Sequence, residues 1–120
     1  MANILVVDDD KNISELYELE LSEDGHNVTL ASSGPEAISH IETHRPDLVV
    51  LDIAMPGMDG IETLSHLLEK YRAMPVILNS AYSQYRDNFM TWPANAYVVK
   101  SGDLTELKMK IQDLLGVFSK

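Results

Sequence analysis

The chain has 120 residues, no cysteine and a formal net charge of −10 at pH 7. The length fits one domain, 45% hydrophobic residues can build a core, and the cysteine count excludes disulfides and thiolate-ligated metals. The negative charge, without a cluster of lysines or arginines, argues against binding to nucleic acid or to anionic membranes. The first residues reach Asp8 after one short apolar run, so we expect neither a signal peptide nor a membrane span, and a cytoplasmic location.

The first quarter of the chain predicts a strand, a helix and a second strand. Residues 4–7 form a β-branched run typical of a strand. The apolar positions within residues 11–24 fall on one face of a helix, and Gly25 supplies its left-handed stop. A shorter strand is expected at residues 27–31.

The next segments predict a capped helix and a buried strand. Ser33 is expected to cap a helix with Pro35 at its first turn. The strand at residues 47–52 has an apolar run without polar alternation, which is typical of a central parallel strand covered on both faces. It delivers Asp52 to its C-terminal end, where open α/β sheets bind ligands.

The second half repeats the alternation of helix and strand. Expected elements are a helix at residues 60–71, a strand at 76–78, a short helix at 84–91, a strand at 96–99 and a helix at 103–118. Five strands and five helices joined by short loops predict an α/β fold with a doubly wound, five-stranded parallel sheet, flavodoxin-like. We expect the strand order 2-1-3-4-5, the known order of flavodoxin-like sheets.

Polar groups follow every predicted strand except the second. They are Asp8, Asp9 and Asp10 after the first strand, Asp52 at the end of the third, Ser80 after the fourth and Lys100 after the fifth. Parallel strands bring these groups to one edge, and converging carboxylates repel one another, so a cation is expected among them. Hard oxygen ligands favour Mg²⁺. Aspartate, metal, lysine and hydroxyl together suit phosphoryl transfer.

Four segments resemble the receiver domain of two-component response regulators. They are residues 6–10, 51–60, 79–81 and 97–100. They occur in order and at matching spacing, and the likeness extends from Ile4 to the last helix. The resemblance implies one receiver domain over residues 1–120, phosphorylated on Asp52 by a sensor histidine kinase or a histidine phosphotransfer protein. Such a domain switches a protein-binding surface and is not a classical enzyme.

The resemblance also implies a role for each site residue. Asp8, Asp9, Asp52 and the Ala54 backbone carbonyl would hold Mg²⁺, Lys100 would contact the phosphoryl group, Ser80 would be the switch hydroxyl and Tyr97 the switch aromatic. Tyr97 could also be an ordinary strand aromatic. Asp10 fits a helix cap better than a metal ligand. The histidines show no ligand spacing, and we expect them at the surface.

Three features depart from the family pattern. Ser101 follows Lys100 where a cis-proline is usual, and a cis bond to another residue costs about 2.5–4 kcal/mol. The segment between Ser80 and Tyr97 is short, and it contains Trp92-Pro93. These features bear on the helix at 84–91 and on the partner surface near it.

Several functions remain open from the residues alone. The chain fits a stand-alone receiver or a receiver fragment of a larger hybrid kinase or regulator. An aspartate-nucleophile phosphatase would want an acid two residues after the nucleophile, where Ala54 stands. The acidic trio argues against a phosphate-independent binding module. The downstream target is not indicated.

Overall fold

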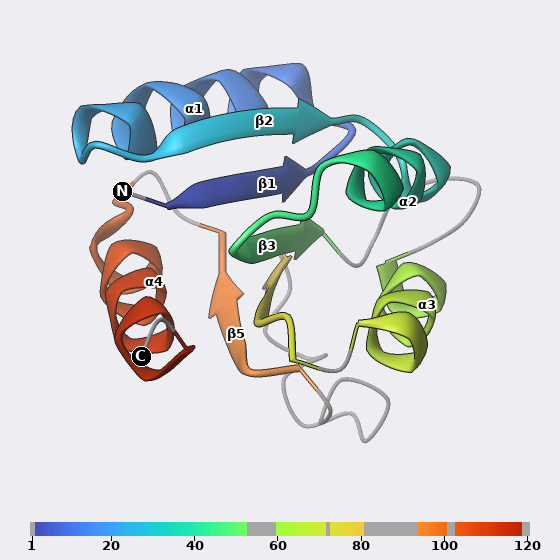
Figure 1. Cartoon of the computed structure of the whole chain (residues 1–120). Coiled ribbons are helices and arrows are strands. Elements are labelled where there is room, and N and C mark those ends of the chain that lie inside the picture. Colours follow the sequence, from blue (N-terminus) through green and yellow to red (C-terminus); the bar gives the residue numbers. More distant parts are fainter. Residues whose placement is uncertain (1, 53–59, 72, 81–93, 101–102, 119–120) are drawn as a thin grey trace.

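Strands and helices alternate along the chain in this computed structural model, which describes residues 2–52, 60–71, 73–80, 94–100 and 103–118 (Figure 1). In order they are β1 (Asn3–Val7), α1 (Lys11–Glu23), β2 (Asn27–Ala31), α2 (Gly34–Thr43), β3 (Leu48–Asp52), α3 (Gly60–Lys70), β4 (Val76–Ser80), β5 (Ala96–Val99) and α4 (Thr105–Phe118). The helix expected at residues 84–91 lies outside the described residues. The last helix, expected as the fifth, is therefore α4.

All five strands belong to one parallel sheet in the order β2-β1-β3-β4-β5, which confirms the predicted topology. Every residue of β3 and β4 is buried. The apolar run of β3 thus predicted its central position correctly. Because β1 and β3 are neighbours, the residues that follow β1 lie beside the end of β3.

Two apolar cores lie on opposite faces of the sheet, because successive strand residues point to opposite sides. Val7 and Leu51 pack with residues of α2 and α3, whereas Val50 and Ile77 pack with residues of α1 and α4. Figure 1 shows these two helix pairs on either side of the strands. The α1 and α4 core also contains the side chain of Tyr17.

Predicted caps hold the starts of two helices. Asp10 caps α1, since its Oδ1 accepts hydrogen bonds from the backbone N–H of Asn12 at 2.9 Å and of Ile13 at 3.3 Å. Ser33 caps α2 by accepting from Glu36 N at 3.2 Å. Gly25, with φ of 93°, follows α1 in the left-handed region, as its predicted role requires. The caps at Asp10 and Ser33 lie beside the C-terminal edge of the sheet, whereas Gly25 turns the chain at the opposite edge, where β2 begins.

Candidate functional site

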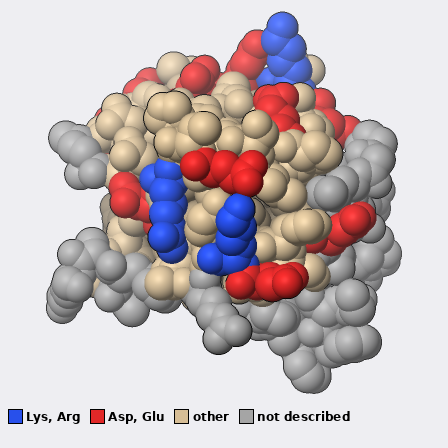
Figure 2. Space-filling model, turned by 45° about the vertical axis from the view of Figure 1, so that its right-hand side comes forward, with Lys and Arg blue, Asp and Glu red and all other residues tan. Residues whose placement is uncertain are grey.

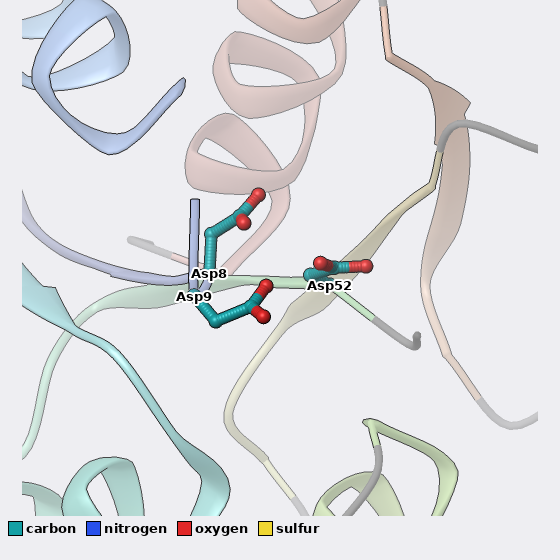
Figure 3. A group of neighbouring side chains, drawn as sticks. All are labelled: Asp8, Asp9 and Asp52. Atoms are coloured by element: carbon teal, nitrogen blue, oxygen red, sulfur yellow. The ribbon is translucent and has the colours of Figure 1, made fainter. Parts of the chain in front are cut away.

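Three carboxylates converge where β1 and β3 end. Asp8 and Asp9 directly follow β1, and Asp52 is the last residue of β3. One carboxylate oxygen from each lies within 4.8 Å of the others, and Figure 3 shows the three side chains around a common space. Asp8 is 3% exposed and Asp52 4%, whereas Asp9 is exposed. The expected approach of the acids is confirmed, and we call these three residues the acidic site.

Lys100 reaches this site from β5, across β4 and on the same face of the sheet. It follows β5, and its backbone N–H donates to the carbonyl of Ser80 at 2.7 Å. Its Nζ lies 2.7 Å from Asp8 Oδ2 and 3.1 Å from Asp52 Oδ2. One ammonium therefore contacts both buried carboxylates. A single positive charge can offset only one of the three negative charges.

Burial and charge act against each other at Asp8 and Lys100. Burial raises the pKa of Asp8 above its ordinary value, although the hydrogen bonds from Lys100 and from the backbone of Asp10 oppose the shift. Burial lowers the pKa of Lys100, but the hydrogen bond to Asp8 and the negative charges of Asp52 and Asp8 outweigh it, so that pKa is raised. The lysine is therefore charged at neutral pH, and ionised Asp8 is held at an energetic cost.

The donor set fits a hard divalent cation. Three carboxylates each offer an oxygen ligand within 4.8 Å of the others, and the one ammonium that contacts two of them, Lys100, leaves room for further positive charge when the acids are ionised. Mg²⁺ prefers such oxygen ligands and retains waters on its remaining positions. Ala54, whose carbonyl was expected to contribute, lies outside the described residues, as does Ser101.

Ser80 and Tyr97 lie near the same edge of the sheet. Ser80 ends β4 and is fully buried, one residue beyond Asn79, which pairs in register with Asp52. Tyr97 lies in β5 and packs, partly buried, against the core that α2 and α3 cover. The positions are compatible with a hydroxyl and an aromatic near the site. Their switching roles stay predictions.

Sequence reasoning missed a hydrogen bond in the core beside the acidic site. Asn79 Nδ2 donates to the Tyr17 hydroxyl at 2.6 Å, and both residues are almost fully buried. Tyr17 was expected only as part of the apolar face of the first helix. Asn79 immediately follows the apolar Leu78 in β4, and a buried amide needs a hydrogen-bond partner. The sequence could therefore have indicated that Asn79 makes a hydrogen bond, but it does not indicate the partner.

The surface shows acidic and basic residues side by side. On the face in Figure 2, Lys and Arg side chains lie next to Asp and Glu and form no broad positive area. Ion pairs also join the helices: Lys108 of α4 lies 3.0 Å from Glu20 of α1, and Lys70 of α3 lies 3.1 Å from Glu42 of α2. Among the described helices, none combines the length and apolar composition required to cross a membrane.

Comparison with solved structures finds close similarity over nearly the whole chain. Response regulator protein TrrA of Thermotoga maritima, in complex with Mg(2+)-BeF, is 44% identical with a TM-score of 0.93, covering 96% of this chain and 100% of that one. TrrA in complex with histidine kinase ThkA matches with the same identity and a TM-score of 0.91. This match covers 96% of this chain and 99% of that one.

Comparison with protein families and curated proteins agrees. The family model described as the response regulator receiver domain matches residues 4–112. The alkaline phosphatase synthesis transcriptional regulatory protein PhoP of Bacillus subtilis is 33% identical over 114 residues, which are 93% of this chain and 48% of that protein. Response regulator ArlR of Staphylococcus aureus is 30% identical over 117 residues, which are 96% of this chain and 53% of that protein. The chain thus spans about half the length of these curated relatives.

Proposed function

Because the chain belongs to the response regulator receiver domain family, we propose that Asp52 is its phosphoacceptor in two-component or phosphorelay signalling. The observation that carries this proposal is the convergence of Asp8, Asp9 and Asp52 around one space, with the Lys100 ammonium against two of them. This arrangement combines a nucleophile with the charges that a phosphoryl group requires.

In the proposed reaction an Asp52 oxygen attacks the phosphorus atom of a phosphohistidine. A P–O bond forms, the P–N bond breaks, and its electron pair leaves with the imidazole nitrogen. Lys100, raised in pKa and therefore charged, neutralises part of the negative charge on the phosphoryl oxygens. Asp8, Asp9 and Asp52, with the Ala54 carbonyl, would hold Mg²⁺, which when bound supplies further charge neutralisation.

The same site is proposed to switch a protein-binding surface. Ser80 would donate its hydroxyl hydrogen to the phosphoryl group, and Tyr97 would change its packing in response. Support comes from their positions, since Ser80 is buried at the end of β4 and Tyr97 lies on the neighbouring β5. We propose that residues 1–120 act as one receiver domain and that it is not a classical enzyme.

A sensor histidine kinase or a histidine phosphotransfer protein is the proposed phosphoryl donor. The complex of the similar protein TrrA with histidine kinase ThkA supports a kinase partner. The formal net charge of −10 supports a protein target and argues against direct contact with nucleic acid or membrane. We propose a cytoplasmic location, where such a kinase presents its phosphohistidine.

Labelling with acetyl phosphate and Mg²⁺ tests the phosphoacceptor directly. Wild-type protein should gain one phosphoryl group that is stable in acid and lost in base, as an acyl phosphate is. Asp52→Asn should abolish labelling, because an amide oxygen is a far weaker nucleophile. Asp113→Asn, an exposed acid on α4, is the matched control and should label normally. Label that persists at a serine or histidine in Asp52→Asn would exclude the proposed acceptor.

A further inference from the structure

The buried hydrogen bond between Tyr17 and Asn79 joins α1 to the middle of the sheet. The two residues are 62 positions apart in the sequence, and only 2% of Tyr17 and 1% of Asn79 is exposed. An apolar pair of the same shape would stabilise the core about equally, since a buried hydrogen bond contributes only about 0.5–1.5 kcal/mol net. Stability alone therefore does not explain the polar pair.

Asn79 lies beneath the path that Lys100 takes to the acidic site. It pairs in register with Asp52 of β3 on one side and with Val98 of β5 on the other. Lys100 stands two residues beyond Val98, so its side chain leaves on the same face of the sheet. To reach Asp52 and then Asp8 it must cross β4, and Asn79 is the last β4 residue on that face.

The amide oxygen of Asn79 has no hydrogen-bond partner among the described residues. The amide nitrogen, Nδ2, donates to the Tyr17 hydroxyl, and the oxygen, Oδ1, is enclosed in the core. A buried acceptor of this kind calls for a donor. The Lys100 ammonium, which carries three donors and contacts Asp8 and Asp52, is the cation that the described residues bring to this part of the core.

We propose that Asn79, oriented by Tyr17, is a positioning residue for Lys100. Tyr17 fixes the orientation of the amide, and the partial negative charge of its oxygen, unpartnered among the described residues, would attract the ammonium that crosses β4, without a direct hydrogen bond, and so favour its place between Asp8 and Asp52. The role assigned to Lys100 rests on the proposed phosphoryl transfer. The confinement itself does not, because it also governs how the ammonium competes with a cation for the same carboxylates.

Loosening Lys100 should have opposite effects on two measurable properties. An ammonium that contacts Asp8 and Asp52 less closely competes less with Mg²⁺, so the metal should bind more tightly. The same ammonium is less well placed to neutralise a phosphoryl group, so phosphorylation should slow down. Damage to the fold alone would weaken both properties together. The direction of the two shifts therefore separates positioning from support of the fold.

The experiment uses Tyr17→Phe, which removes only the hydroxyl, and Asn79→Leu, which replaces the amide by an apolar group of similar size. Calorimetric titration should give a Kd for Mg²⁺ about threefold lower in each variant, the size expected from loosening one ion-pair partner. Phosphorylation by acetyl phosphate should be about 10-fold slower, a modest displacement effect. The double variant should change no further, since the pair acts as one unit.

Two controls test whether the effect passes through Lys100. Leu21→Ala removes apolar contacts from the same helix and the same core, and it should leave Mg²⁺ affinity and phosphorylation rate unchanged while the protein is folded. In a Lys100→Met background, Tyr17→Phe and Asn79→Leu should no longer alter Mg²⁺ affinity. Shifts in the same direction, unchanged values, or effects that persist without Lys100 would each overturn the proposal.

The two arms also separate this proposal from the proposed function. If wild-type protein is not phosphorylated at all, the phosphoacceptor proposal fails. The Mg²⁺ titrations still decide whether Tyr17 and Asn79 position Lys100.

Discussion

Burial opposes the ionisation of Asp8. Its side chain is 3% exposed, and it accepts a hydrogen bond from the backbone of Asp10 at 2.8 Å while Lys100 lies 2.7 Å away. Even with these partners, burial leaves its pKa above the ordinary value of 3.8. The folded protein therefore holds a proton on Asp8 more readily than the unfolded chain does.

This shift has a definite sign in the pH dependence of stability. Between pH 3.8 and the raised pKa of Asp8, the folded state binds more protons than the unfolded state. The contribution of Asp8 to the free energy of unfolding therefore falls as pH rises through that window, and it stays low at neutral pH. Asp8→Asn removes the unfavourable charge and can retain the hydrogen bond from Asp10.

We predict that Asp8→Asn raises the free energy of unfolding at pH 7 when Mg²⁺ is removed with a chelator. Urea unfolding of the variant and the wild type measures the difference. At pH 3, below both pKa values, the acid is protonated in either state and the gain should largely vanish. A gain of equal size at the two pH values would show that charge is not its cause.

At the scale of elements, the start of α1 determines where Asp8 and Asp9 lie. The loop between β1 and α1 is short, and Asp10 ends it by capping two backbone N–H groups. Ser14, in the second turn of the helix, donates its hydroxyl to the carbonyl of Asp8 at 3.3 Å. The helix thus secures the loop at two points.

We predict that Asp10→Ala lowers the free energy of unfolding by about 1 kcal/mol, the usual cost of losing a side-chain cap. Asp10→Asn keeps an oxygen that can accept the same hydrogen bonds. This variant should therefore lower the free energy of unfolding by only a few tenths of that cost. Urea unfolding of the three proteins provides the comparison. If the asparagine and alanine variants lose equal amounts of unfolding free energy, the negative charge at position 10, rather than the cap, would be responsible for the stability.

For the whole molecule, the strand order concentrates negative charge at one point. The sheet order puts β1 beside β3, and their acids meet in a protein whose formal net charge is already −10. A cation that binds only the folded arrangement should therefore stabilise the fold. The unfolded chain does not bring Asp9, Asp8 and Asp52 together, since the first two are more than 40 positions from the third.

We predict that Mg²⁺ raises the thermal midpoint. At a concentration about ten times its Kd the gain is about 1.4 kcal/mol, and each kcal/mol shifts the midpoint by about 4 °C for a domain of this size. Calorimetric melts with and without Mg²⁺ measure it. Sodium chloride of equal ionic strength controls for screening, and Asp9→Asn should reduce the shift. An equal rise with sodium chloride, or an undiminished one in Asp9→Asn, would contradict a specific site.

The sequence by itself determined the order of elements and the residues of the acidic site. Local periodicity distinguishes helix from strand, and parallel strands must bring their C-terminal residues to one edge, so the meeting of Asp8, Asp9 and Asp52 was predictable. The exact ends of the helices and strands were less predictable. The strand predicted at 76–78 continues to Ser80, because Asn79 pairs with Asp52 and Ser80 with Val99 in the ladders. The helix predicted from 103 begins at Thr105, because Asp103 accepts from its backbone N–H at 2.9 Å.

Only the tertiary structure decided which distant polar groups meet. The reach of Lys100 across β4 to two carboxylates depends on strand order, register and side-chain length together. The partner of Asn79 depends on how α1 packs on the sheet, which sequence spacing does not express. The raised pKa of Asp8 depends on how completely those elements exclude water. Periodicity records which face of an element is buried, but hydrogen bonds between elements form only where packing brings particular atoms within about 3 Å.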